Sequence, residues 1–400
     1  MSVARTRGKR RTAPGALALL AIALVGLLSS CGGDSNPPDT LVFISRKNGE
    51  YTVRMPRSGN QKPLELGSVL RSDAMPVWSA DGTRIAFYGD RVFNLTNADD
   101  NVDVYVMAAD GSALTRLTDD EKEDAFPVWS PDGSRIAFYS QRDGDGESYS
   151  IAPDGTDLRR LTHSPGIDIP YGYSPDGTRI LFGSNARGAF DIYTMDTDGG
   201  AGKRLTSLPG DEFNAAWSPD GRRIAFEGMW GGASDIFTMN SDGGNEVNRT
   251  VRPLGDTNPV WAPDSNRLAF VSNRDASAEI YVMDTAYSNL VRVTDAIRED
   301  ATPAWSPDGT RVAFISNRDF NAELYVANAD GSGQRRLTID EGREAGPAWS
   351  PDGTRIAFAS FRGGRRDIYV IQPDGTALVR LTNDDQGLAS ALTGAAPGLD

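Results

Sequence analysis

The chain has almost none of the two residue types on which much enzyme and metal chemistry depends. Its 400 residues include one cysteine, Cys31, and one histidine, His163. A single cysteine excludes internal disulfides and cysteine-based zinc sites. A single histidine removes histidine-rich metal sites and most histidine-dependent catalysis, and no Gly-x-Ser-x-Gly nucleophile turn is present. Several large enzyme classes are therefore disfavoured.

Basic charge is also scarce once the first thirty residues are passed. The chain carries 41 Lys and Arg against 55 Asp and Glu, a formal net charge of -14 at pH 7. Five of the basic groups and none of the acids lie in residues 1–30, so the remainder is more acidic still. Such a field repels phosphate backbones, and we expect no nucleic-acid partner.

Long apolar runs are missing except near the N-terminus. Residues 16–28 form an apolar stretch that follows a basic run and leads into Ser29, Ser30 and Cys31. The stretch is shorter than the ~20 residues that span a bilayer and is typical of a secretory signal core. It resembles the bacterial lipoprotein signal, in which small residues precede a lipidated cysteine; the alternative is an ordinary signal peptide with an incidental cysteine.

This resemblance predicts a signal peptide over residues 1–30 and lipidation at Cys31. Residues 31–40 are rich in Gly, Pro, Asp and Ser and are expected to form a flexible tether. We therefore expect a membrane-anchored lipoprotein on the extracytoplasmic side of the cell envelope.

The rest of the chain consists of one repeated unit. An aromatic residue followed by Ser-Pro-Asp-Gly or a variant recurs every 44 residues after one longer interval, at Trp78, Trp129, Tyr173, Trp217, Trp261, Trp305 and Trp349. A phenylalanine that closes an apolar run recurs eight times on the same spacing, from Phe43 to Phe358. Each unit contains four short candidate strands, which is the composition of a β-propeller blade.

We therefore predict an all-β fold, a β-propeller of four-stranded blades over residues 41–394, with residues 395–400 as a tail. About eight blades are expected, with seven blades and an irregular first unit as the alternative. The first unit lacks its inner strand, and residues 389–394 stand one repeat after the inner strand of the last unit. The C-terminal segment is thus expected to supply the missing strand and close the ring, which removes a free sheet edge.

The repeat also resembles a known family. Its elements Trp-Ser-Pro-Asp-Gly, Ile-Ala-Phe, Ser-Asn-Arg, Ile-Tyr-Val-Met, Asp-Gly-Ser and Arg-Leu-Thr are similar to those of the TolB C-terminal β-propeller. The same unit occurs in the propellers of prolyl-oligopeptidase-type peptidases. The resemblance covers nearly all of the chain after its first forty residues and implies an envelope protein that binds other molecules.

No nucleophile, base and orienting group come together in the sequence, and His163 lies between two repeats. We therefore expect a non-catalytic, monomeric binding scaffold for an envelope protein or a glycan. The alternative is a propeller enzyme, a hydrolase or lyase that uses carboxylates at the mouth of the central channel.

Acidic residues recur at two positions of the repeat. One set stands five residues before each signature aromatic: Asp73, Asp124, Asp168, Glu212, Asp256, Asp300 and Glu344. The other stands two residues before each third-strand aromatic: Asp103, Glu147, Asp191, Asp235, Glu279, Glu323 and Asp367. An arginine four residues after the repeat phenylalanine, such as Arg318, is expected to lie between the two carboxylates of its unit and join the loops. The alternative is an acidic ring that attracts cations or a basic partner.

This pattern breaks in the fourth and fifth units, where Ala186 and Trp230 take the place of the arginine. An aromatic surface beside carboxylates that lack their usual counter-charge suits a basic side chain or a sugar. The predicted ligand site consists of Asp168, Tyr171, Glu212, Phe213, Trp230 and Asp235. The alternative is that Trp230 packs over a neighbouring loop.

One short segment alternates acids with glycines. Asp143, Asp145 and Glu147 are separated by single glycines, and such oxygen ligands can hold Ca²⁺. The segment is shorter than a full calcium loop, and an acidic hairpin turn is the alternative. We expect no other metal or cofactor.

Overall fold

The computed structural model describes strand residues 43–47, 50–55 and 64–66 and residues 74–89, 102–200, 202–230, 232–251, 254–275, 277–286, 289–362 and 366–382. The chain divides into two compact units, Met1–Val69 and Leu70–Asp400. Within the described ranges, no helix is long and apolar enough to cross a membrane.

The first unit contains one small antiparallel sheet. Its three strands are β1 (Phe43–Lys47), β2 (Glu50–Met55) and β3 (Leu64–Leu66), paired in that order. The repeat that begins with Phe43 is therefore a three-stranded sheet and not a four-stranded blade.

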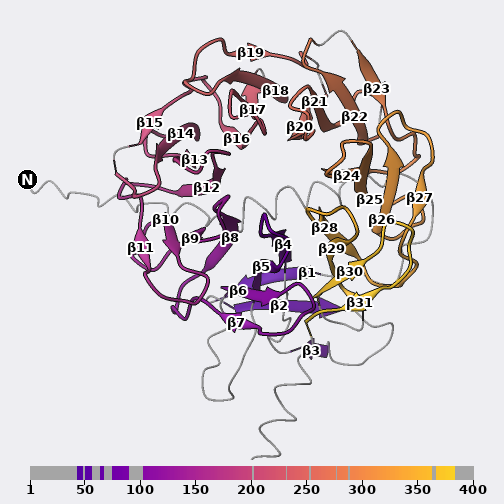
Figure 1. Ribbon diagram of the computed structural model, residues 1–400, viewed down its shortest axis with the longest axis horizontal. Helices are drawn as coiled ribbons and strands as arrows, with labels where there is room; N and C mark the ends of the chain where they lie inside the picture. The colour runs from indigo at the N-terminus through magenta and orange to yellow at the C-terminus, as the bar shows by residue number, and fades with distance from the viewer. Residues whose placement is uncertain are drawn as a thin grey trace, which may run out of the picture. The chain divides into compact units, whose positions relative to one another are not determined.

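The second unit is a ring of seven four-stranded antiparallel sheets, each made of consecutive strands (Figure 1). Blades 1 to 3 are β4 (Ala74–Trp78), β5 (Arg84–Gly89), β6 (Asp103–Ala108) and β7 (Thr115–Arg116); β8 (Asp124–Trp129), β9 (Ile136–Ser140), β10 (Glu147–Ile151) and β11 (Arg159–Arg160); and β12 (Asp168–Tyr173), β13 (Arg179–Ser184), β14 (Asp191–Asp196) and β15 (Lys203–Arg204).

Blades 4 to 7 follow the same plan. They are β16 (Glu212–Trp217), β17 (Arg223–Trp230), β18 (Ala233–Asn240) and β19 (Val247–Asn248); β20 (Asp256–Trp261), β21 (Arg267–Ser272), β22 (Glu279–Asp284) and β23 (Leu290–Arg292); β24 (Asp300–Trp305), β25 (Arg311–Ser316), β26 (Glu323–Asn328) and β27 (Arg335–Arg336); and β28 (Glu344–Trp349), β29 (Ile356–Ser360), β30 (Asp367–Ile371) and β31 (Val379–Arg380).

The Ser-Pro-Asp-Gly segment makes the turn between the first two strands of a blade. In blade 6, Ser306 Oγ donates to Asp308 and accepts from the backbone of Arg311, while the backbone of Thr310 donates to Asp308. Gly309 adopts φ 66°, a left-handed conformation that glycine takes without a Cβ penalty. The turn residues are thus held by their own side chains, which explains why the segment recurs in the repeat.

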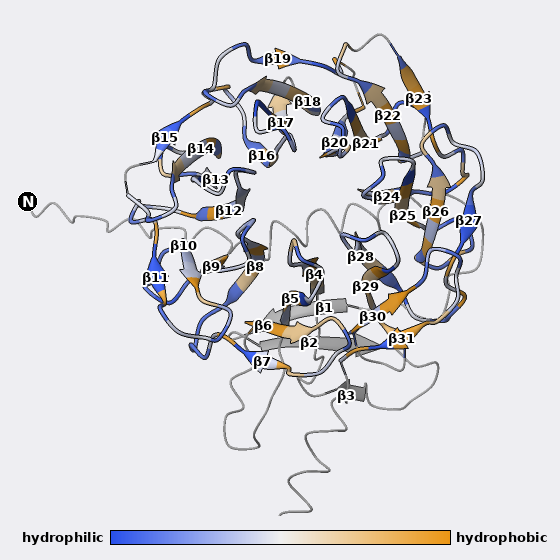
Figure 2. Cartoon of the chain, in the orientation of Figure 1, coloured by the Kyte–Doolittle hydropathy of each residue, from blue (hydrophilic) through white to orange (hydrophobic). Residues whose placement is uncertain are grey.

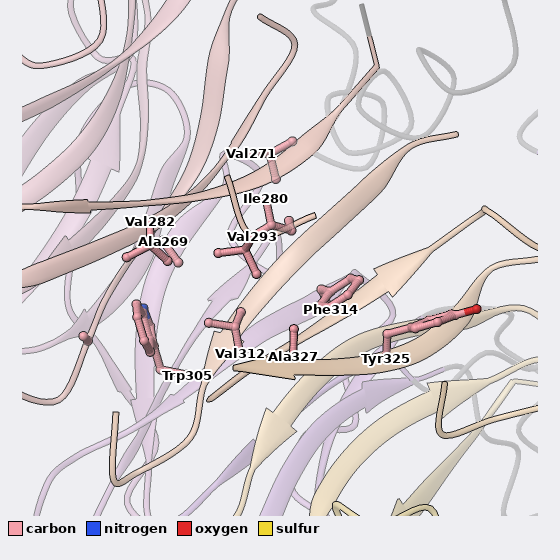
Figure 3. Packing of buried hydrophobic residues seen from close by; sticks show 11 residues of the cluster. Ala269, Val271, Ile280, Val282, Val293, Trp305, Val312, Phe314, Tyr325 and Ala327 are labelled. Atoms are coloured by element: carbon pink, nitrogen blue, oxygen red, sulfur yellow. The ribbon is translucent and has the colours of Figure 1, made fainter. Parts of the chain in front are cut away.

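The core lies between neighbouring blades. Ala269, Val271, Ile280 and Val282 of blade 5 pack against residues of blade 6 that include Trp305 (Figure 3). The second and third strands carry most of the apolar residues, whereas short outer strands such as β11, β15 and β27 are hydrophilic (Figure 2). Each face of a blade is covered by a neighbouring blade. The middle strands therefore need apolar residues on both faces, that is, along their whole length.

The ring closes between blades 7 and 1 with the contacts that join other neighbours. Trp78 Nε1 donates to Ala348 O at 3.1 Å, and the Arg355 guanidinium lies 4.9 Å from the centre of the Trp78 ring. The equivalent distances between blades 5 and 6 are 3.1 Å and 4.8 Å. In the described residues, blades 7 and 1 therefore pack as other neighbouring blades do.

The predicted number of blades is wrong. The propeller has seven blades, not eight, and the alternative count is the correct one. The described contacts between the last blade and the first join β28 and β29 to β4. Residues 389–394, which were expected to supply a closing strand, lie outside the described residues.

Candidate functional site

The two sets of acidic residues lie at one end of the ring. In blade 6, Asp300 pairs with Ser316, Ser316 pairs with Glu323, and Thr338 Oγ1 donates to Glu323. This is the end where the first strand of each blade begins and where the chain enters the ring at Ala74. We call it the entry face; it carries the hairpins between second and third strands and the loops between blades.

Each described carboxylate of the regular blades has an arginine of its own. In blade 6, Arg318 binds Asp300 at 2.9 Å, and Arg336 from the outer strand binds Glu323 at 2.7 Å. The first arrangement recurs in the pairs Asp124–Arg142, Asp256–Arg274 and Glu344–Arg362, and the second in Asp103–Arg116, Glu147–Arg160, Asp191–Arg204, Glu279–Arg292 and Asp367–Arg380.

The prediction of one arginine between two carboxylates is therefore wrong. The hairpin arginine also donates to a serine of its own strand, as Arg318 does to Ser316, and this contact holds it on the first acid. The second arginine was missed, although its signal is visible in the sequence as the Arg of the Arg-Leu-Thr element.

These carboxylates are buried, so they do not form an exposed ring of negative charge. Asp300 and Glu323 are both fully buried. Burial raises the pKa of Asp300 to about 6 and the pKa of Glu344 to about 7, against hydrogen bonds and arginines that lower them. Their ion pairs and hydrogen bonds connect hairpins, outer strands and loops, so these carboxylates form a structural network.

In blades 3 and 4 of the ring, which are the fourth and fifth repeats, neutral donors replace the arginine at Asp168, Glu212 and Asp235, whereas Asp191 keeps Arg204. Ser164 donates to one oxygen of Asp168, and the other oxygen has no hydrogen-bond partner among the described residues. Glu212 accepts from Thr206 Oγ1 and from the Leu208 backbone. Burial raises the pKa of Glu212 to about 7. Asp235 accepts from Asn248, which takes the place of the outer-strand arginine, at 2.8 Å.

Two aromatic residues of the predicted site, Tyr171 and Phe213, are partly buried. Tyr171 packs over Gly183, where any Cβ would collide with its ring. Phe213 packs on Phe190, with ring centres 5.5 Å apart. Trp230 pairs with Ala233 at the tip of the β17–β18 hairpin, and its side chain lies outside the described residues.

The acidic hairpin of blade 2 is occupied by protein contacts. Asp143 is hydrogen-bonded by Tyr149 and Arg160, and Glu147 by Arg160 and Thr162, while Asp145 is exposed. Across the residues that the structure describes, no group of three or more His, Cys, Asp or Glu side chains is placed to hold a metal ion. This arrangement gives the calcium hypothesis no support.

A buried acid that the sequence prediction missed lies inside blade 4. The position after the repeat phenylalanine holds Tyr88, Tyr139, Gly183, Glu227, Val271, Ile315 and Ala359 in blades 1 to 7. Glu227 is 6% exposed, and burial raises its pKa. The signal was an acid that interrupts the apolar run of a second strand.

Glu227 connects the innermost strands of two blades. One of its oxygens, Oε1, accepts from Asn214 Nδ2 of β16 at 2.6 Å and from the backbone N–H of Asn258 of β20 at 2.5 Å. We call these three residues the inner polar cluster. The carboxylate fixes both asparagines relative to one another across the boundary between blades 4 and 5.

The two asparagines face solvent at the centre of the ring. Both lie in the middle of innermost strands (Figure 1), at β-bulges, with φ of 49° and 55°, and both are exposed. The same bulge position is left-handed in four other blades, at Met75, Phe126, Thr302 and Gly346. Uncharged carboxamides are thus presented where the other blades show apolar residues, threonine or glycine.

Seven four-stranded blades around one axis define a β-propeller. The chain belongs to the family of PD40, the TolB beta propeller domain, whose sequence pattern matches residues 89–166, 202–301 and 259–395, more than half of the chain.

Individual relatives are more distant. An uncharacterized peptidase of Bacillus subtilis, YuxL, is 30% identical over 97 residues, which are 23% of this chain and 14% of the peptidase. The chain thus matches only a small part of that relative's length.

Two solved structures show the same fold at low identity. The propeller domain of the Trilobed protease from Pyrococcus furiosus, described as an open velcro topology, has a TM-score of 0.61 at 13% identity, over 80% of this chain and 98% of that one. An oligogalacturonate lyase from Vibrio parahaemolyticus has a TM-score of 0.59 at 15% identity, over 82% and 95%.

Proposed function

We propose that this protein is a membrane-tethered, non-catalytic propeller lipoprotein of the cell envelope, which binds an envelope protein or a glycan at the centre of its ring. The inner polar cluster carries the proposal. Burying a carboxylate inside a blade costs free energy. Hydrogen bonds from Asn214 and Asn258 offset part of that cost for Glu227, and the same bonds hold the two asparagines in place. Residues that break the repeat without serving the fold are candidates for binding.

The chemistry of the cluster suits recognition of polar groups. A carboxamide donates and accepts hydrogen bonds, so it can bind peptide groups and sugar hydroxyls alike. Asn214 is fixed by its bond to Glu227, and the bulge fixes the backbone of Asn258. Fixing these side chains before binding lowers the entropy lost when a ligand binds.

An enzyme that uses carboxylates is the second candidate, and Glu227 with its raised pKa is the observation that favours it. A pair of inward-facing acids would favour catalysis further. The regular acids of the entry face are instead bound by arginines, and His163 is exposed in the loop between β11 and β12. We therefore favour binding.

The tether is the part of the proposal that concerns residues 1–40. Lipidation of Cys31 would hold the propeller at a membrane on the extracytoplasmic side. The apolar run before Cys31 and the small residues next to it support this anchor.

The proposal is tested with Asn258→Gly, which removes the carboxamide without straining the backbone. Gly346 occupies the same bulge position of blade 7 with φ 58°. The partner is first identified by chemical crosslinking of the intact envelope. We expect Asn258→Gly to weaken its binding about tenfold, the equivalent of one or two lost hydrogen bonds, with no change in melting temperature.

Asn245→Gly is the matched control, because Asn245 is an exposed asparagine with φ 54° in the turn between β18 and β19, at the other end of blade 4. Equal affinities of the two variants would place the binding site elsewhere. Turnover of a peptide or glycan by the purified protein, abolished by Glu227→Gln, would establish the enzyme instead.

A further inference from the structure

Exposed apolar side chains gather on the entry face of the second half of the ring. The three most exposed of them are Ile297 at 99%, Phe320 at 84% and Ile339 at 82%. Ile297 and Ile339 lie in the loops that lead into β24 and β28, and Phe320 lies in the β25–β26 hairpin. Met229, Val251 and Leu254 continue this set in the hairpin and outgoing loop of blade 4. We call these six residues the apolar rim.

The equivalent loops of blades 1 to 3 have a different character. Residues 119–123 read Asp-Asp-Glu-Lys-Glu, and residues 141–146 read Gln-Arg-Asp-Gly-Asp-Gly. In the described loops and hairpins on the entry face of these three blades, no large apolar side chain is exposed. Among the described loops, the apolar rim is therefore a property of one side of the entry face and not of the repeat.

The rim residues lie outside the clusters that pack between blades. Large apolar side chains that remain in water at several neighbouring loops mark a surface that is covered in the working protein.

The proposed lipid anchor indicates what covers this surface. The apolar run before Cys31 and the small residues next to it support an anchor that would hold the protein at a bilayer. A bilayer would then be the nearest apolar phase to the exposed side chains of the ring.

We propose that the apolar rim inserts into the boundary between headgroups and acyl chains of the membrane that carries the anchor. This inference rests on the lipid anchor of the proposed function. Separate apolar tips between polar residues fit a lipid interface, which accepts the tips and leaves the polar residues in water.

The charges beside the rim indicate the type of lipid surface. Asp295 and Glu299 flank Ile297, and the Arg298 guanidinium is used locally, 4.2 Å from the centre of the Phe320 ring. Acids repel anionic lipids. The contact between the apolar rim and the membrane therefore comes from the apolar side chains. It does not depend on salt concentration and favours neutral headgroups.

A depth measurement on the full chain tests this inference. Ile297→Cys is labelled with the fluorophore NBD, and the protein is reconstituted into phosphatidylcholine vesicles that contain doxyl-labelled lipid. Leu158→Cys is the matched control, since Leu158 is an exposed leucine in the β10–β11 loop at the opposite end of the ring. We expect severalfold stronger quenching by doxyl lipid at position 297 than at position 158, at low and at high salt.

Equal quenching at the two positions overturns the inference. A blue-shifted label at position 297 without doxyl quenching also overturns it, because the rim is then covered by protein. Mass spectrometry of the same sample reports separately on Cys31. An unmodified Cys31 contradicts the anchor of the proposed function, while the quenching result still decides whether the rim enters lipid.

Discussion

At the scale of single residues, the buried carboxylates of this propeller are stabilised in two ways. Asp300 is bound by Arg318, whereas Glu212 is bound only by a hydroxyl and a backbone amide in the described structure. A guanidinium offsets the cost of burying a charge, and neutral donors offset less of it. Glu212 should therefore respond to pH more strongly than acids at the surface.

The pH dependence of Glu212 can be stated with its sign. Burial raises the pKa of Glu212 from 4.5 to about 7, so its contribution to folding stability is complete below pH 4.5 and is lost as the pH rises to 7. Glu212→Gln cannot ionise, and its carbonyl oxygen keeps an acceptor for the Leu208 backbone. We expect the stability of the variant relative to the wild type to increase between pH 4.5 and pH 8 in urea titrations.

Asp308 is the control for this series. Hydrogen bonds from Ser306 and Thr310 lower the pKa of Asp308 to about 2, so its stabilising contribution is lost only in strong acid. The difference between Asp308→Asn and the wild type should be constant from pH 5 to pH 8. A Glu212→Gln profile that is equally flat would show that Glu212 ionises normally in the fold.

At the scale of the strand and the blade, the inter-blade tryptophan is the main repeated contact. Trp305 is 7% exposed, donates to Val260 O of the preceding blade, and lies under Arg267 of that blade. The same residue thus ends an innermost strand and joins two blades. This double use explains why the aromatic position recurs with so little variation along the chain.

Trp305→Ala is expected to destabilise the propeller by about 3–5 kcal/mol, the usual cost of removing a large buried aromatic side chain. Urea unfolding measures the change. Trp230→Ala, which removes the tryptophan outside the repeat, should leave the free energy of unfolding nearly unchanged and weaken binding of the partner. If Trp230→Ala lowers the free energy of unfolding more than Trp305→Ala does, Trp230 is a structural residue.

At the scale of the whole molecule, ring closure depends on the packing of blade 7 against blade 1. Trp78, Ile85 and Phe87 share one buried cluster with Ile368 and Val370 of the last blade. These contacts all lie between residues 74 and 382. The seven described blades are formed by the strands between Ala74 and Arg380.

Truncation after Thr382 should leave the melting temperature unchanged, because no inter-blade contact in the described structure is removed. A scanning calorimetry experiment measures this. Truncation after Gly342, which deletes blade 7, exposes the apolar faces of blades 6 and 1 and should abolish cooperative unfolding. A lower melting temperature for the chain that ends at Thr382 would support the predicted role of residues 389–394 in closure.

The residue pattern alone determined the blade, its four strands and the turn that joins the first two. These features depend on contacts within a few residues, such as those of Ser306 with Asp308 and Arg311, and such contacts leave a mark in every copy of the repeat. The two sets of acids and the loss of arginine at Ala186 and Trp230 were visible for the same reason. Their burial was not, because it depends on the neighbouring blade.

Only the tertiary structure decided the number of blades, the closure and the partners of each acid. A repeat that begins at Phe43 has the pattern of a blade, but the ring is already closed by Trp78 and Arg355. The role of Glu227 could not be predicted from the sequence, because its partners belong to other strands. Asn214 stands 13 residues before it and Asn258 stands 31 residues after it. Contacts between residues distant in the chain follow from the curvature of the whole ring, and this curvature is a property of seven packed blades together rather than of any one repeat.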